Sequence, residues 1–232
     1  MSEYRSPSYF GVHNYGTVIV DAFGNVGIIG DYTNGNLTRI DMGTLIIYAK
    51  ARQVSGVFEI RDNASVKVSN TSDNALRIER GTIAGQGTID ANLTLGFDPL
   101  IYPVGQRQTD AKISPSGGPD APEIGTLTIV HAFQIFDGTM AIDVNAAGLF
   151  DKVIVQGQYA ALAGTLTLSI SQNYKPAQLV HLDFLRYQSV VGDFTTKASM
   201  LPTYTVQPGN QVFRWTFIKT STSYAIYNLL IN

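Results

Sequence analysis

Apolar and polar residues alternate at a period of two along most of this sequence. The alternation is clearest in four segments: Gly125–Ile129, Gly138–Val144, Asp151–Val155 and Gly164–Leu168. Successive side chains of a β-strand point to opposite faces, so Leu127 and Ile129 are expected on one face and the intervening threonines on the other. Strands of this kind that recur every one to three dozen residues predict a coiled sheet in which each turn stacks on the previous one.

The N-terminal half carries the same pattern. Its alternating segments include Gly16–Val20, Leu45–Tyr48, Gly56–Ile60, Ser65–Val68 and Ala75–Ile78. Asn, Asp, Ser and Gly separate these segments, as expected for corners between short strands. Near the other end, Val212–Ile218 and Tyr224–Leu229 are two longer alternating segments. We expect these two to pair as a hairpin that covers the open edge of the last turn.

Five prolines interrupt the pattern between residues 96 and 124. Proline cannot donate to a central ladder, so this segment is expected to be an irregular loop or insertion. We therefore predict an all-β fold, a β-solenoid best described as a right-handed parallel β-helix with a C-terminal capping hairpin. Its parts would be residues 1–95 (N-terminal cap and first turns), 96–124 (loop or insertion) and 125–232 (later turns and cap).

Composition narrows the possible functions. The chain has 232 residues, no cysteine, 15% charged residues and a formal net charge of −2. The lack of cysteine excludes disulfides, thiolate catalysis and Cys-ligated zinc. The near-neutral charge gives no electrostatic reason to expect nucleic acid or an acidic membrane as a partner. No apolar run is long enough for a transmembrane helix, and no signal peptide is visible, so membrane insertion is not expected.

Few side chains have the type and spacing expected of a catalytic site. Asp62 and Asp73 lie in polar segments that could align if one turn separates them, as the carboxylates of β-helix glycosidases and lyases must. The simpler interpretation is that they form turns by bonding their own backbone. The glycine-rich segment Gly81–Asp90 lacks the following helix that a phosphate cradle needs, because another strand, Asn92–Leu95, is predicted next.

Histidines and surface tyrosines give no clear site either. His13, His131 and His181 are far apart and lack metal-ligand spacing. Neither a nucleophile elbow nor a calcium-loop motif occurs. We therefore predict no catalytic residue, no cofactor and no metal. Three further tyrosines, Tyr102, Tyr159 and Tyr187, could either stack on sugar rings or pack along the edges of turns, and the sequence leaves both interpretations open.

A family resemblance supports the fold. The order Ile113-Ser114-Pro115, Gly125–Ile129, Asp151–Val155, Leu162–Leu166 and Ser189–Phe194 resembles the autotransporter-associated β-helix segment of large bacterial surface proteins. With weaker similarity back to Gly81, it covers roughly half to two-thirds of the chain. Two features depart from the family: a longer insert follows the Ser-Pro turn, and no membrane-embedded barrel is visible, so strict autotransport is not expected. The resemblance implies a parallel β-helix and leaves function open among adhesins, aggregation factors and enzyme carriers.

We predict a non-enzymatic structural and attachment protein on an exterior surface. Its home would be a virion, as a decoration or fibre component, or a bacterial cell surface, as an adhesin-like or secreted piece. Expected partners are other copies of itself or a neighbouring structural protein, with cell-surface polysaccharide as a further candidate. The alternative is a polysaccharide-degrading β-helix enzyme, a lyase or glycoside hydrolase.

Overall fold

The fold is all-β. The computed structural model describes residues 11–69, 74–97, 110–117, 124–197, 203–207 and 209–231. Every regular element within these ranges is a strand, and most strands pair in parallel in two long sheets. The prediction of an all-β chain with stacked parallel strands is therefore confirmed. No helix among the described residues is long and apolar enough to cross a bilayer.

The strands form three parallel ladders. The first ladder is the smaller sheet and contains β1 (Val12–Asn14), β3 (Tyr32–Asn34), β5 (Ala51–Gln53), β8 (Ala75–Ile78), β11 (Asn92–Leu95), β14 (Phe133–Ile135), β17 (Ala160–Leu162) and β20 (Val190–Gly192). The second ladder contains β6 (Val57–Ile60), β9 (Thr82–Gly85), β12 (Lys112–Ile113), β15 (Thr139–Val144), β18 (Thr165–Ile170) and β21 (Thr196–Lys197). The third ladder contains β7 (Ser65–Val68), β10 (Thr88–Asp90), β13 (Thr126–Ile129), β16 (Lys152–Val155) and β19 (His181–Arg186).

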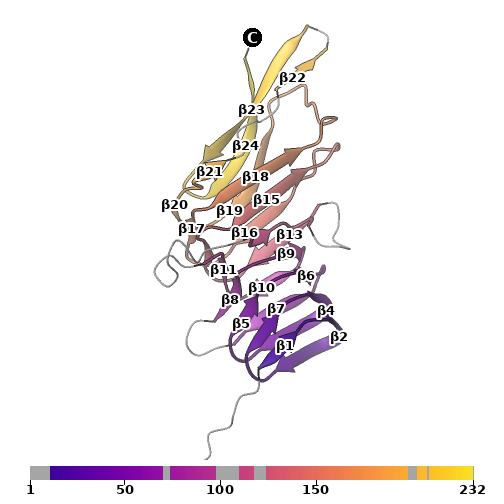
Figure 1. The fold of residues 1–232 in the computed structure, drawn as a ribbon. Helices are drawn as coiled ribbons and strands as arrows, with labels where there is room; N and C mark the ends of the chain where they lie inside the picture. The colour runs from indigo at the N-terminus through magenta and orange to yellow at the C-terminus, as the bar shows by residue number, and fades with distance from the viewer. Residues whose placement is uncertain are drawn as a thin grey trace, which may run out of the picture.

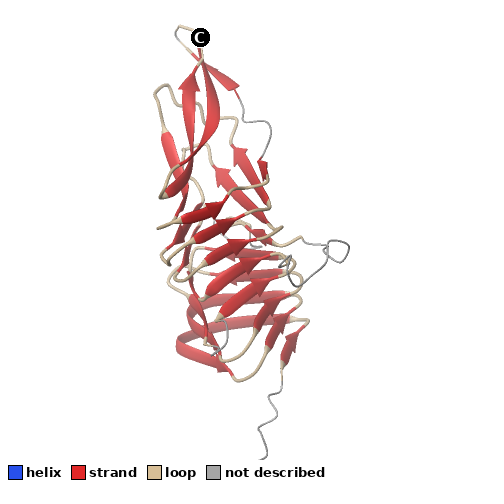
Figure 2. Cartoon of the chain, turned by 90° about the vertical axis from the view of Figure 1, so that its left-hand side faces the viewer, coloured by secondary structure: helices blue, strands red, loops and turns tan. Residues whose placement is uncertain are grey.

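Two long strands join the second and third ladders. β2 (Thr17–Ile28) pairs with β4 (Leu37–Ile47) along most of its length. The first part of β4 pairs with β6 and its last part with β7. From β3 onward the chain thus visits the first, second and third ladders in the same order in each turn. Figures 1 and 2 show the result, an elongated stack with β1 and β2 at one end and the C-terminal strands at the other.

The core consists of apolar side chains that stack from turn to turn. In the second ladder, the buried residues Phe58, Ile83, Ile113, Met140 and Leu166 occupy matched register positions. The first ladder contributes a similar buried stack of Leu76, Leu93, Phe133 and Ala160. Because the register aligns inward-facing positions, each turn covers the apolar surface of its neighbour, as repeat architectures require.

A buried polar ladder runs beside this core in the first three turns. Asn14 Nδ2 donates to Asn34 Oδ1 at 2.6 Å, and Asn34 Nδ2 donates to Gln53 Oε1 at 2.5 Å. These three residues also share register positions in the first ladder. Because each amide bonds its counterpart in the next turn, the corner stays satisfied without water.

Glycines make one corner between the first and second ladders possible. Gly81 has a φ of +78°, and a Cβ at this position would lie 2.3 Å from the carbonyl oxygen of Gly56 in the turn below. Gly56 approaches the carbonyl oxygen of Asn36 in the same way. A side chain at Gly81 would therefore both strain the backbone and separate two turns.

The predicted C-terminal hairpin forms. β23 (Gln211–Lys219) and β24 (Ser223–Leu230) pair in antiparallel fashion, and β22 (Thr203–Val206) pairs with β23. The hairpin does not lie across the end of the stack as a lid. Instead β24 pairs antiparallel with β19 and so satisfies the free edge of the third ladder. This is another way of protecting an edge strand.

The proline-rich segment 96–124 is partly integrated in the stack. Lys112 and Ile113 form β12, which pairs with β9 and β15 in the second ladder. Residues 98–109 and 118–123 lie outside the described residues. The division into 1–95, 96–124 and 125–232 therefore stays a prediction, with the addition that a short strand lies inside its middle part.

Candidate functional site

The two aspartates considered from the sequence do not form a described site. Asp62 is exposed in the turn between β6 and β7, where Ala64 N donates to Arg61 O at 3.0 Å. This position fits the turn-forming interpretation. Asp73 lies outside the described residues, so the alignment of the two carboxylates stays untested.

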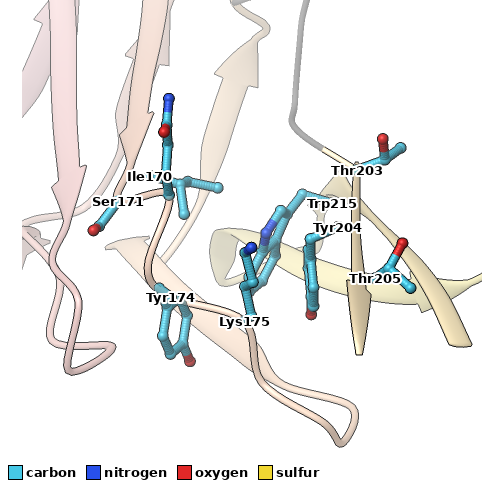
Figure 3. A pocket seen from close by; sticks show the side chains of 9 residues that line it. Ile170, Ser171, Tyr174, Lys175, Thr203, Tyr204, Thr205 and Trp215 are labelled. Atoms are coloured by element: carbon cyan, nitrogen blue, oxygen red, sulfur yellow. The ribbon is translucent and has the colours of Figure 1, made fainter. Parts of the chain in front are cut away.

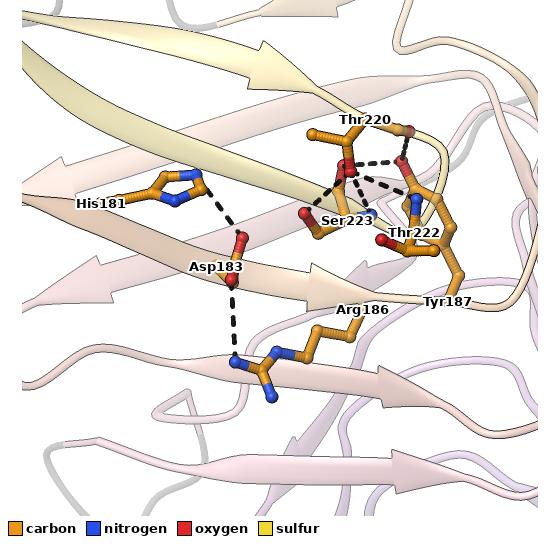
Figure 4. Close-up of polar contacts among 7 residues, drawn as sticks. All are labelled: His181, Asp183, Arg186, Tyr187, Thr220, Thr222 and Ser223. Atoms are coloured by element: carbon orange, nitrogen blue, oxygen red, sulfur yellow. Dashed lines mark hydrogen bonds and ion pairs between the residues drawn. The ribbon is translucent and has the colours of Figure 1, made fainter.

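The three histidines lie on separate parts of the stack. His13 is on β1, where its ring stacks near Tyr15. His131 Nε2 lies 3.0 Å from Asp90 Oδ1, and His181 Nε2 lies 3.6 Å from Asp183 Oδ1 (Figure 4). In the ranges that the structure describes, no group of three or more His, Cys, Asp or Glu side chains could hold a metal ion.

The tyrosines considered as sugar platforms have structural partners. Tyr187 is buried, and its hydroxyl lies 3.0 and 2.8 Å from the carbonyl oxygens of Thr220 and Ser223, tying the last turn to the hairpin (Figure 4). Burial raises the pKa of Tyr187 to about 12. Tyr159 is half-buried and accepts a hydrogen bond from Gln134 Nε2 at 2.6 Å. These two favour edge packing, and Tyr102 lies outside the described residues.

A carboxylate pair that sequence reasoning missed consists of Asp143 on β15 and Asp151 directly before β16. The Ser116 hydroxyl is 2.6 Å from Asp143 Oδ2 and 2.8 Å from Asp151 Oδ2. Asp151 is fully buried, and burial raises the pKa of its carboxyl group. Its oxygens also accept the amide hydrogens of Gly125 and Asp143. Asp151 therefore pins three segments together, whereas Asp143 is half-buried.

The N-terminal end of the stack presents an open edge with apolar side chains. We call β1 and β2, with the exposed side chains between Val12 and Ile29, the N-terminal edge. Within the described residues, β1 pairs only with β3 and β2 only with β4, so each strand has one unpaired side. Tyr15, Phe23 and Ile29 are 76%, 98% and 75% exposed. Unpaired strand sides and exposed apolar side chains are what a stack presents where a further turn is missing.

At the other end, an open pocket lies between the hairpin and the last turns. We call it the aromatic pocket; its volume is about 500 Å³, and its lining includes Ser171, Gln172, Tyr174, Lys175, Tyr204 and Trp215 (Figure 3). Ser171 to Lys175 belong to the segment that follows β18, whereas Tyr204 is on β22 and Trp215 on β23. The pocket is therefore formed jointly by residues of the hairpin and residues of the last turns.

Buried Asn228 on β24 fixes the relative position of these segments. Its Oδ1 accepts a hydrogen bond from Val180 N at 2.5 Å, and its Nδ2 donates to Gln178 O at 2.9 Å and to the Tyr204 hydroxyl at 2.7 Å. Tyr204 in turn donates to Pro176 O at 3.1 Å. The segment after β18 is thus bonded to the hairpin through a fully buried amide, which makes the pocket preformed.

No family model matches the sequence, and no curated protein matches it significantly. The similarity to autotransporter-associated β-helices therefore stays a prediction from the motifs of the chain.

Proposed function

We propose that this chain is a non-enzymatic structural and attachment protein on an exterior surface, whose three ladders close into a right-handed parallel β-helix. The regular order in which the chain visits the ladders supports the β-helix, because nearly all parallel crossovers are right-handed. Resemblance to bacterial surface segments supports the exterior location.

The observation that carries the proposal is the contrast between the two ends. At the C-terminal end, the antiparallel strand β24 satisfies the edge of β19 and so covers the third ladder, whereas β20 and β21 each pair on one side only within the described residues. The N-terminal edge instead leaves backbone groups of β1 and β2 unpaired within the described residues and exposes Phe23 almost completely. An exposed, long edge strand with apolar side chains is a template on which another chain can pair. The partner of this end would be a second copy or a neighbouring structural protein.

Sedimentation velocity tests the contact. The wild type should associate as concentration rises, and the double variant Phe23→Ser/Ile29→Ser should shift toward monomer. Leu149→Ser is the matched control, because Leu149 is also exposed but lies in the turn between β15 and β16. An equal effect of the control would contradict a role for the N-terminal edge.

Peptide mass spectrometry on washed envelope, cleared medium and gradient-purified particles of a producing culture tests the location. Enrichment in particles would support a virion component, and enrichment in the envelope would support an adhesin-like protein. Presence only as a monomer in cleared medium would refute both.

The carboxylate pair favours one second candidate, a polysaccharide-degrading β-helix enzyme. Asp143 and Asp151 both lie within hydrogen-bond distance of Ser116, and Asp143 lines a depression of about 420 Å³. Two nearby carboxylates are the minimum for glycoside hydrolysis. Release of reducing ends or unsaturated products from bacterial polysaccharides, lost on Asp143→Ala, would establish this function in place of the first.

A further inference from the structure

The aromatic pocket combines a row of rings with polar groups at its margin. The Trp215 indole lies between two tyrosines, with ring centroids 5.7 Å from Tyr174 and 6.0 Å from Tyr204. The planes of Trp215 and Tyr174 differ by only 22°. Trp215 and Tyr204 are buried, whereas Tyr174 is half-buried, so part of its ring is open to the pocket. Rigid amphipathic rings of this kind suit ligands that have both C–H faces and hydroxyl groups.

An unpartnered polar atom points to a ligand. Trp215 Nε1 is buried and has no hydrogen-bond partner among the described residues, although the residue lines the pocket. In Figure 3 the indole nitrogen is turned away from Tyr204, toward the side of Ile170 and Lys175. Buried tryptophan N–H groups normally find an acceptor, so a hydroxyl or carboxylate oxygen of a ligand would complete this site.

The charge of the pocket narrows the chemistry of that ligand. Lys175 is the charged side chain among the described lining residues, it is exposed, and it forms no ion pair within the described part of the chain. Among the described residues that line the pocket there is no carboxylate. A cation beside aromatic rings favours an anionic group attached to a ring-shaped polar ligand.

A second depression adjoins the aromatic pocket. Ser171 lines both the aromatic pocket and the depression that contains Ser116, Asp143, Asn145 and Ser169. Asp143 would repel an anion, so this neighbouring surface suits hydroxyl groups rather than a carboxylate. An occupant that spans both depressions would place its acidic unit near Lys175 and a neutral part near Ser171.

We infer that the aromatic pocket binds a carboxylated sugar unit of an acidic polysaccharide. Tyr174 would contact the C–H face of the ring, the Trp215 indole would donate to a ring oxygen or hydroxyl, and Lys175 would pair with the carboxylate. This inference deepens the proposed attachment function and rests on it for its biological setting. The chemistry of the pocket can be tested separately, because the pocket and the N-terminal edge lie at opposite ends of the stack (Figure 1).

The test is isothermal titration calorimetry of the full chain with hexasaccharides of galacturonate and mannuronate, and with a neutral galactose hexasaccharide. We expect an acidic hexasaccharide to bind with a Kd below about 1 mM, and the neutral one at least about fivefold more weakly. Lys175→Gln should weaken acidic-sugar binding about fivefold and remove most of its salt dependence. Trp215→Phe keeps an aromatic ring at this position but lacks the indole N–H, and should weaken binding about three- to tenfold.

Lys50→Gln is the matched control, because Lys50 is an exposed lysine in the second turn, remote from the pocket. Thermal melting of each variant separates loss of binding from loss of folding. Absence of binding to both acidic hexasaccharides, or equal affinities of the Lys175→Gln, Trp215→Phe and Lys50→Gln variants, would overturn the inference. Sugar binding that persists in Phe23→Ser/Ile29→Ser would show that the pocket acts independently of association, whichever way the sedimentation result falls.

Discussion

Replacement of Asn34 by alanine should destabilise the N-terminal turns more than replacement of its half-buried neighbour Thr33. Asn34 is fully buried at the centre of the polar ladder and bonds both neighbours, Asn14 and Gln53. Its Nδ2 also lies 3.1 Å from Asn36 O. The alanine variant removes these bonds and leaves polar atoms of two buried side chains without their partner.

The expected loss in free energy of unfolding follows from the polar groups that lose their hydrogen-bond partners. Each buried polar group that loses its partner costs about 1–3 kcal/mol. Gln53 is fully buried and Asn14 nearly so. Asn14 keeps its bond to Leu37 O at 2.9 Å, which limits its share. We therefore expect the Asn34→Ala change to reduce the free energy of unfolding by about 3–5 kcal/mol.

Urea denaturation followed by far-ultraviolet circular dichroism measures this loss, and amide hydrogen exchange locates it. Exchange should accelerate in β1, β3 and β5 first, because stability in a stacked repeat is local to neighbouring turns. Thr33→Ala on β3 is the control, since Thr33 is only half-buried and should cost less than about 1 kcal/mol. Equal losses for the two variants would refute the reasoning that the amide ladder holds these turns together.

Three further predictions test other contacts. Gly81→Ala should reduce the free energy of unfolding by about 2 kcal/mol or more, because its φ is +78° and the new Cβ would meet the carbonyl oxygen of Gly56. Gly16→Ala should be tolerated, and thermal melts compare the two variants. Burial raises the pKa of Asp151 above 3.8, so the folded state binds that proton more tightly than the unfolded state. The stabilising contribution of the Asp151 carboxyl group is therefore lost as the pH rises through its raised pKa. In urea melts, the free energy of unfolding of the wild type relative to that of Asp151→Asn should increase as the pH falls toward 3.8. A difference in free energy that does not change with pH would contradict this. Tyr187→Phe should cost about 1 kcal/mol, and spectrophotometric titration should lose a tyrosine with a pKa of about 12.

The strands could be predicted because their signal is local. Alternation with period two is visible in Thr126–Ile129 and Lys152–Val155, and both form strands of the stack. The pairing of β23 and β24 was predictable for the same reason, since two long alternating segments flank a short turn. β12 was not predictable, because Lys112 and Ile113 are too short to show a period and gain their strand geometry from β9 and β15.

The candidate sites depend on tertiary contacts that no local pattern shows. Tyr174 and Trp215 are 41 residues apart in the sequence and meet only because the hairpin docks against the last turns. The one usable signal was that Trp215 is the single tryptophan in the chain. The Ser116 hydroxyl likewise reaches Asp143 and Asp151 through stacking of the second and third ladders. Asp143 lies within β15, and the sequence signal of Asp151, an aspartate before a strand, is shared with ordinary turns.

The direction of the strands explains why the two ends of the stack differ. Parallel ladders have the same strand direction in every turn, so the edge of β2 accepts a further parallel turn as readily as β4 accepts β2. At the other end the chain reverses, and antiparallel β24 uses the edge of β19, so a further parallel strand cannot be added to the third ladder there. The reversal also brings Trp215 against the segment after β18 and so creates the aromatic pocket. One topological change therefore blocks a complete further parallel turn at the C-terminal end and creates the aromatic pocket, whereas the described strands of all three ladders are unpaired at the N-terminal edge.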